Sequence, residues 1–287
     1  MSTQITTGFV NHYHSNVDVM AQQKGSRLRP AVREERVTGK EAFFDQIRAT
    51  AARRRTTRHG DTPLIDTPHD RRKVTLLDYD WADLIDDTDR VRLITDPTSA
   101  YVRNAAFAMG RAVDDVIIAA ATGTAYSGVS GGTANTFDTT NNRVVSSSTG
   151  MTVAKILDAK EILDGYDIDP DIPRYLALTS AQVSDLLNAT EVKSIDYNTV
   201  RALAEGNLNT FCGFNIVRTE RLGLVGSERR CLAWARDGIL LAVGKESSAK
   251  VTERPDKNYA VQVYYSMSVG AVRMSEDWVV DILCTES

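Results

Sequence analysis

Apolar positions follow two different rhythms along this chain, and the first rhythm is helical. Between positions 97 and 121 they recur every three or four residues, at Val102, Ala105, Met109, Val113 and Ile117. This spacing places the apolar side chains on one face of a helix. Asp96 and Pro97 suit the N-cap and the first helical position, and Gly123 ends the run. The pattern predicts one helix of about 25 residues, with a length on the order of 37 Å.

After Phe211 the period changes to two, which indicates strands. The segments concerned are "FNIVRT", "RCLAWARDG", "ILLAVG", "NYAVQVYYSMSVGAVRM" and "DWVVDILC". Upstream, "TVAKILDAKEILDG" predicts an amphipathic helix with Gly165 as its C-cap, "RYLALT" a short buried strand, and "SAQVSDLLN" a helix capped by Ser180. Residues 125–150, rich in Gly, Ser, Thr and Asn, predict a loop or a weak hairpin. Helices and strands do not alternate as βαβ units, so the fold class is α+β.

The first ninety residues carry weaker patterns. Residues 1–40 are polar and aperiodic, which predicts an extended arm with no core of its own. Residues 41 to about 52 fit a short helix that has Phe44 and Ile47 on one face. Residues 53–89 are expected to form a protruding hairpin or loop, in which "KVTLLDYDWADLID" suits a strand and a turn.

Composition narrows the range of functions. The chain has 287 residues, 34 basic and 38 acidic side chains, and a formal net charge of −4. A protein whose main task is to hold nucleic acid carries a clear basic excess, which is absent here. No apolar run approaches roughly 20 residues, so no membrane span is expected, and the first residues lack the pattern of a secretory signal. Cys212, Cys231 and Cys284 are expected to be free, buried thiols of a protein made in a reducing cytosol.

The charge is nevertheless segregated into two adjacent blocks. Residues 48–73 hold eight basic and three acidic side chains, and residues 78–96 hold seven aspartates and two arginines. A block of +5 beside a block of −5 can neutralise copies of itself, which indicates self-assembly. The expected intersubunit contacts are Arg53, Arg54, Arg55, Arg58, Arg71, Arg72, Asp83, Asp86, Asp87 and Asp89.

Candidate catalytic and metal motifs fail on inspection. Gly128-x-Ser130-x-Gly132 matches a nucleophile elbow, but a helix precedes it and every histidine lies earlier in the chain. The "DIDPD" stretch at 167–171 begins like a calcium loop but lacks its glycine and glutamate, so an Asp-Pro turn is the better interpretation. His12 and His14 lack a third ligand, and Asp86, Asp87 and Asp89 have no phosphate-binding loop beside them. We therefore expect no catalytic residue, no metal site and no cofactor, and a protein that is not an enzyme.

The order of the elements resembles one known family. A strand-helix unit, "RYLALTSAQVSDLLN", is followed by "GFNIV", by "CLAWARDGILLAVG" and by the long strand within "NYAVQVYYSMSVGAVRM". This order is similar to the C-terminal half of tailed-bacteriophage major capsid proteins with the Hong Kong 97-like fold. Upstream, an arm, an extended loop and a long helix also match. The resemblance covers nearly the whole chain and lies in the order and type of the elements, because no single motif is diagnostic.

The resemblance implies a particular division of the chain. It assigns residues 1–52 to an N-terminal arm and short helix and 53–95 to an extended loop. Residues 96–150 and 248–287 would form a peripheral domain with the long helix as its spine, and 151–247 an axial domain. The expected function is a major capsid protein that forms pentamers and hexamers in an icosahedral shell around the double-stranded DNA of a tailed phage.

Partners and location follow from the same resemblance. Because the sequence has no long helical, charged N-terminal extension, a separate scaffolding protein is implied, together with a portal protein and an optional decoration protein. The chain would be made in the bacterial host cytoplasm and reside in the virion. It would enclose DNA without sequence-specific binding and without a membrane.

Two alternatives stay open at this point. An encapsulin-type shell shares the fold and packages a cargo enzyme, although such shells usually begin with a helix where this sequence has a polar arm. A nucleic-acid-binding protein, of a different class, would use the Arg53–Arg58 run. Steep salt-dependent affinity for DNA would distinguish that function from assembly.

Overall fold

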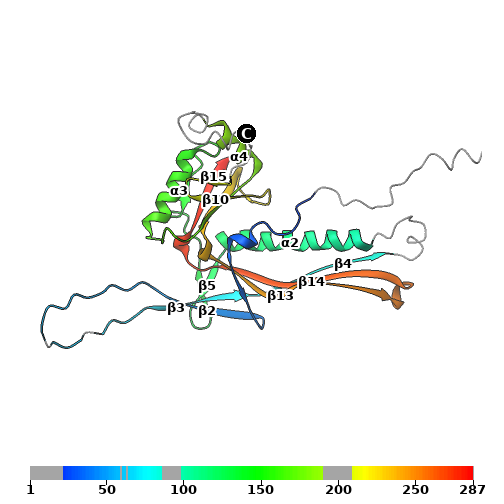
Figure 1. The fold of residues 1–287 in the computed structure, drawn as a ribbon, viewed down its shortest axis with the longest axis horizontal. Helices are drawn as coiled ribbons and strands as arrows, with labels where there is room; N and C mark the ends of the chain where they lie inside the picture. Colours follow the sequence, from blue (N-terminus) through cyan, green and yellow to red (C-terminus); the bar gives the residue numbers. More distant parts are fainter. Residues whose placement is uncertain (1–21, 59, 63, 86–97, 190–208, 287) are drawn as a thin grey trace, which may run out of the picture. The chain divides into compact units, whose positions relative to one another are not determined.

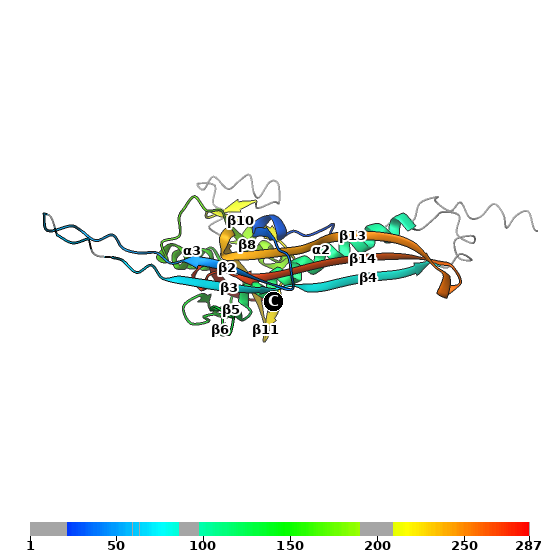
Figure 2. The ribbon, with the colours of Figure 1, turned by 90° about the horizontal axis from the view of Figure 1, so that it is seen from below.

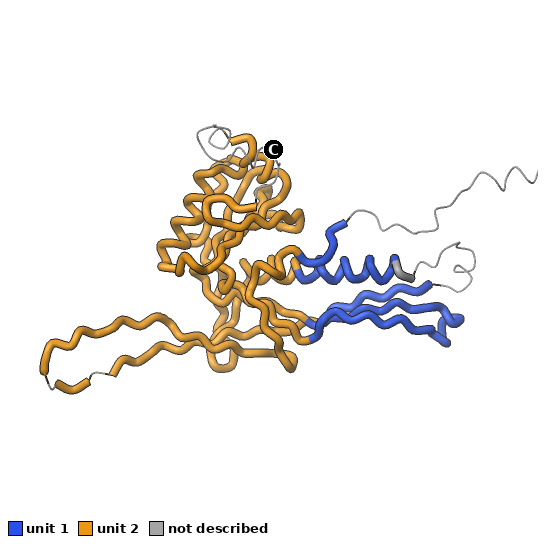
Figure 3. The backbone as a smooth tube through the Cα atoms, in the orientation of Figure 1, with its two compact units in different colours: residues 1–26, 78–113, 245–268 blue, residues 27–77, 114–244, 269–287 orange. Residues whose placement is uncertain are grey.

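The computed structural model describes residues 22–58, 60–62, 64–85, 98–189 and 209–286. The chain divides into two compact units, coloured separately in Figure 3. Unit 1 comprises Met1–Ser26, Asp78–Val113 and Lys245–Ser268, and unit 2 comprises Arg27–Leu77, Asp114–Gly244 and Val269–Ser287. Each unit is built from three separate stretches of chain, so long-range contacts hold it together.

Three α-helices confirm the helical periods of the sequence. They are α2 (Thr98–Thr122), α3 (Val153–Gly165) and α4 (Ser180–Asn188). The expected cap of α4 is wrong by one residue. Thr179, not Ser180, is the N-cap, since Thr179 has an extended backbone and its N–H donates to Gln182 Oε1 over 3.1 Å. Similarly, the residue after Gly165, Tyr166, caps α3. None of the helices in the described ranges is long and apolar enough to cross a membrane.

A seven-stranded sheet forms the larger part of unit 2 (Figure 1). Its order is β7-β15-β12-β8-β10-β9, with β11 paired to β12. The strands are β7 (Arg143–Val144), β8 (Arg174–Leu178), β9 (Thr210–Phe211), β10 (Phe214–Arg218), β11 (Leu224–Val225), β12 (Glu228–Ala235) and β15 (Val279–Thr285). Helix α3 packs against β15. The period-two segments therefore form strands as predicted, and Trp234 and Leu176 lie in their core.

A second sheet in unit 2 corrects the first predicted helix. Its order is β2-β3-β5-β6, with β2 (Glu41–Ile47), β3 (His69–Thr75), β5 (Ala125–Ser127) and β6 (Thr133–Asn135). The short helix expected over 41–52 is wrong, because Glu41–Ile47 pairs antiparallel with His69–Thr75 along its whole length. Seven residues with little intrinsic preference follow their tertiary partner rather than local propensity. The weak hairpin expected in 125–150 is confirmed by β5 and β6.

A third sheet has the order β1-β13-β14-β4. Its strands are β1 (Arg33–Arg36), β13 (Ile239–Arg254), β14 (Ala260–Arg273) and β4 (Leu77–Ile85). Figure 2 shows β13, β14 and β4 running side by side. Strand β13 continues ten residues beyond the predicted "ILLAVG" segment, through a polar stretch whose residues are mostly exposed. Alternation of apolar and polar residues identifies a strand only where one face is buried, so it could not predict this exposed part of β13.

Part of the expected arm belongs to the core of unit 2. Leu28, Ala31 and Val32 are each 1% exposed, and the indole N–H of Trp234 donates to the carbonyl of Ala31 over 2.9 Å. The buried carboxylate of Asp114 accepts the backbone N–H groups of residues 27 and 28 over 3.0 to 3.1 Å. The expectation of an arm with no core contact is therefore wrong for this segment. Its apolar residues are too few and too irregularly spaced to show a period.

Candidate functional site: the charged hairpin

Strands β2 and β3 carry the basic block on an antiparallel hairpin. The loop between them spans residues 48–68 and projects from unit 2 (Figures 1 and 3). Three ion pairs link the two arms: Asp45 with Arg71 at 2.5 Å, Glu41 with Lys73 at 2.7 Å, and Arg48 with Asp70 at 3.3 Å. Opposite charges facing each other across strands stabilise the pairing modestly and set its register. These three ion pairs therefore neutralise the charges on strands β2 and β3, at the base of the hairpin, within the same chain.

The arginine run lies in the loop and is not neutralised. Arg53, Arg54, Arg55 and Arg58 are all exposed. Arg55 Nε donates to the carbonyl of Thr57 over 3.1 Å. Among the residues that the structure describes, no carboxylate lies within ion-pair distance of these four guanidinium groups. The loop therefore presents four uncompensated positive charges.

Exposed apolar side chains flank the same charges. Leu64 is 96% exposed, Ile47 69% and Ile65 50%. Single exposed apolar residues are ordinary, but two on one projecting loop and a third, Ile47, at its base, beside a charge cluster, have the composition of an interface. The sequence has no periodic pattern that predicts these exposed apolar residues, because an unpaired loop does not require regular hydrophobic spacing.

Arg71 has a local role. Its guanidinium group lies 5.8 Å from the centre of the Phe43 ring and forms the ion pair with Asp45. The hydrogen bond from Arg71 holds the pKa of Asp45 below its ordinary value, and the same bond raises the pKa of Arg71. Both side chains are largely exposed, so this pair contributes little to stability.

Arg72 is the clearest correction among the expected contact residues. Successive residues of a strand point to opposite faces, so Arg72 points away from Arg71 and into the molecule. It is 2% exposed, and its Nη2 lies 2.6 Å from Glu276 Oε2. Its charge therefore serves the interior of its own chain. The number of basic residues in the sequence does not show which of them face outward from β3 and which face inward, because this depends on the strand register.

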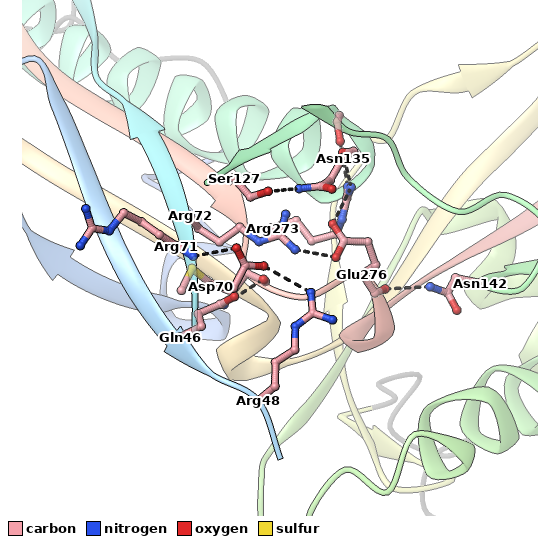
Figure 4. A network of polar contacts seen from close by, with 12 residues as sticks. Gln46, Arg48, Asp70, Arg71, Arg72, Ser127, Asn135, Asn142, Arg273 and Glu276 are labelled. Carbon is pink, nitrogen blue, oxygen red and sulfur yellow. Dashed lines mark hydrogen bonds and ion pairs between the residues drawn. The ribbon is translucent and has the colours of Figure 1, made fainter. Parts of the chain in front are cut away.

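Arg72 belongs to a buried polar network, shown in Figure 4. Arg273, fully buried, donates through Nη1 to the carbonyls of Ala121 and Gly123, over 2.9 and 2.8 Å, and through Nη2 to that of Asn135 over 3.3 Å. Burial lowers the pKa of Arg273. The network ties the C-terminal end of α2 to β6 and β14. Sequence analysis did not single out Arg273, since nothing in its local pattern indicates that it is buried.

The acidic block is only partly described. Asp83 is exposed on β4, in unit 1, and its Oδ1 accepts the N–H of Leu84 over 2.8 Å. Asp80 on the same strand accepts the hydroxyl of Tyr264 over 2.7 Å. Asp86, Asp87 and Asp89 lie outside the described residues. Asp83 belongs to unit 1 and the arginine run to unit 2.

The rejected chemical motifs have structural roles. Ser130 lies on the turn between β5 and β6, where Gly131 N–H donates to the carbonyl of Gly128 over 3.0 Å. Asp169 Oδ1 accepts the N–H of Asp171 over 3.0 Å, which is the expected turn. Within the described ranges no group of His, Cys, Asp or Glu side chains is arranged to hold a metal ion. The arrangement around the hairpin is suited to protein contacts.

Comparisons with known proteins agree with this fold. The sequence profile of a family described as phage capsid protein matches residues 5–286. The capsid structure of cyanophage P-SCSP1u aligns with 100% of this chain and 96% of its own, at 17% identity and a TM-score of 0.73. The head structure of Helicobacter pylori bacteriophage KHP40 aligns with 99% and 98%, at 10% identity and a TM-score of 0.75. The capsid of Ralstonia phage GP4 aligns with 97% and 96%, at 12% identity and a TM-score of 0.72.

A search of curated proteins found no match. The family match extends over nearly the whole chain, and the solved structures share its α+β arrangement along nearly their full length. The expected Hong Kong 97-like fold is therefore confirmed. The chain belongs to the phage capsid protein family and is a major capsid shell protein.

Proposed function

We propose that copies of this chain assemble as pentamers and hexamers into an icosahedral shell, and that this shell encloses the double-stranded DNA of a tailed bacteriophage. The observation that carries the proposal is the loop between β2 and β3. It places four unpaired guanidinium groups and two exposed apolar side chains, Leu64 and Ile65, on a segment that adds little to the packing of its own unit. Such a segment gains contacts only from another molecule, and closed symmetric shells repeat each contact at every subunit.

The proposed division of the chain follows the same scheme. Residues 96–150 and 248–287 would form the peripheral part and residues 151–247 the axial part of each subunit. Residues 1–52 would form an arm, with strand instead of helix at 41–47, and residues 53–95 the extended loop. We also propose that a separate scaffolding protein directs assembly, that a portal protein occupies one vertex, and that synthesis takes place in the host cytoplasm before the chain enters the virion.

Electron microscopy of the expressed chain, alone and with the products of its neighbouring genes, tests the proposal. Closed particles with five-fold and six-fold capsomers are the expected result. Sedimentation of the same samples separates shells from capsomers and monomers. A chain that stays monomeric with a scaffolding protein supplied, and that is absent from virions, would contradict the proposal. Particles that enclose an enzyme instead of DNA would favour an encapsulin-type compartment.

A further inference from the structure

A cavity of about 870 Å³ lies within unit 2, between the base of the charged hairpin and the turn that follows α3. Six carboxylates and three guanidinium groups line it, which gives a net charge of −3. The carboxylates belong to Asp45, Asp167, Asp169, Asp237, Glu276 and Asp277. A concave surface with one dominant sign of charge focuses its field on an occupant of the opposite sign.

Among the described residues, the lining arginines form a single ion pair with these acids, between Arg72 and Glu276. Arg33 pairs with Glu35 at 2.8 Å and Arg48 with Asp70 at 3.3 Å, and neither of these acids lines the cavity. Arg72 pairs with Glu276, and Asp45 is bound by Arg71. Four lining carboxylates have no ion-pair partner among the residues that the structure describes, namely Asp167, Asp169, Asp237 and Asp277.

The electrostatics of the lining also favour a cationic occupant. Burial, followed by the neighbouring charge of Glu276, raises the pKa of Asp277, and the charges of Arg48 and Arg72 act in the opposite direction without reversing this shift. The guanidinium groups of a cationic peptide segment would lie against the unpaired carboxylates and compensate their charge.

We propose that this cavity receives the Arg53–Arg55 run of a second copy of the chain. The inference rests on the proposed function and names the surface that the run contacts. The run is exposed and unpaired in its own chain. Arg53 lies six residues beyond the end of β2 at Ile47, a reach of about 20 Å at 3.3 Å per residue. In this contact, the guanidinium groups of a neighbouring copy neutralise the four unpaired carboxylates of the cavity. The arginine run therefore does not require the exposed acidic block on β4 as its partner.

Charge reversal on each side tests this contact. The cavity variant is Asp169→Lys with Asp277→Lys, and Asp167 stays unchanged because its φ of +55° tolerates few residues. Reversing the loop arginines 53–55 to Glu gives the loop variant. Each variant alone should raise the concentration needed for assembly by roughly tenfold or more, since like charges then face each other. Asp78→Lys with Glu253→Lys, at exposed positions on β4 and β13, is the matched control and should assemble normally.

Combining the variants distinguishes a neighbour from the chain's own cavity. When the loop variant and the cavity variant are mixed, each loop finds a complementary cavity only on the other molecule, so particles that contain both are expected. A contact within one chain would be rescued by both changes in the same chain but not by mixing. Rescue in the double variant alone would therefore overturn the second-copy assignment.

Folding and wild-type controls keep the outcomes separate. Circular dichroism and melting temperature of the unassembled variants must match those of the wild type; if the lysine variant fails to fold, Asp169→Asn with Asp277→Asn replaces it and should weaken assembly by a smaller factor. Normal assembly of a folded cavity variant would overturn this inference and leave the proposed function intact. Failure of the wild-type chain to form any particle would instead contradict the proposed function.

Discussion

At the scale of single residues, the two neighbours Arg71 and Arg72 show how strand register decides what a charge does. Arg71 faces outward and pairs with exposed Asp45, whereas Arg72 faces inward and pairs with Glu276. A buried ion pair costs desolvation that only good geometry and further hydrogen bonds offset. Arg72 and Arg273 share Glu276, so the interior holds two cations for one carboxylate. Carbonyl groups must supply the remaining stabilisation.

Replacing Arg273 with Met is expected to destabilise the subunit strongly. The carbonyls of Ala121, Gly123 and Asn135 would lose their donor, and a large buried side chain would be truncated. We expect the free energy of unfolding to fall by about 3–5 kcal/mol. Urea denaturation of the unassembled protein measures this.

The same substitution at exposed Arg53 provides the control. A surface side chain without partners should change the free energy of unfolding by less than about 0.5 kcal/mol. Equal losses at the two positions would mean that the buried network does not carry the stability assigned to it.

At the scale of elements, Gly110 allows α2 to pack closely against residues 22–26. A Cβ added to Gly110 would lie 2.4 Å from the Cα of Gly25. Gln22 bridges the same helix, since its Oε1 accepts from Arg111 Nη1 over 2.6 Å and its Nε2 donates to Asn104 over 3.0 Å. Backbone atoms cannot yield as a flexible side chain does. The helix and residues 22–26 therefore form one packed element of unit 1.

Replacing Gly110 with Ala should displace this segment and leave α2 intact. Overpacking of a close contact costs about 1–3 kcal/mol, so cleavage by trypsin after Lys24 should accelerate by about fivefold or more. Time courses followed by mass spectrometry measure the rate. Gly165→Ala is the control, because no heavy atom lies within 4 Å of its added Cβ. Unchanged cleavage in the Gly110 variant would contradict the close packing.

At the scale of the whole molecule, we propose that the exposed loop between β2 and β3 acts in assembly. Its arginines add nothing to the fold of unit 2, so a change there should separate folding from assembly. Contacts between exposed charges are individually weak, but a shell repeats them at every subunit. A small change in the free energy of each contact therefore has a large effect on the stability of the whole shell.

Reversing the three arginines Arg53, Arg54 and Arg55 to Glu is expected to block shell formation while the monomer stays folded. Negative-stain microscopy detects shells, and circular dichroism confirms the fold. The Lys substitutions at the same positions retain the charge and should assemble. Normal shells from the Glu variant would contradict an intersubunit role, and loss of a salt-dependent DNA affinity in such shells would assign the run to nucleic acid.

The sequence by itself determined the elements whose periods are long and regular. The helix ending near Thr122, the strands β12, β14 and β15, and the order of elements that identifies a capsid fold could all be predicted, because apolar residues at helical spacing, or in runs of strand length, mark buried elements. The exposure of the arginine run was also predictable, since such a cluster is rarely buried.

Only the tertiary structure decided the rest. Residues 41–47 form a strand because 69–75 offer a pairing edge, and residues 28–32 enter the core, where Trp234 and Asp114 bind backbone groups of Ala31 and Leu28. The inward face of Arg72 and the cavity lined by Asp169 and Asp277 depend on segments far apart in sequence. Such contacts leave no local period, because each residue's environment is set by partners that the chain brings together only when it folds.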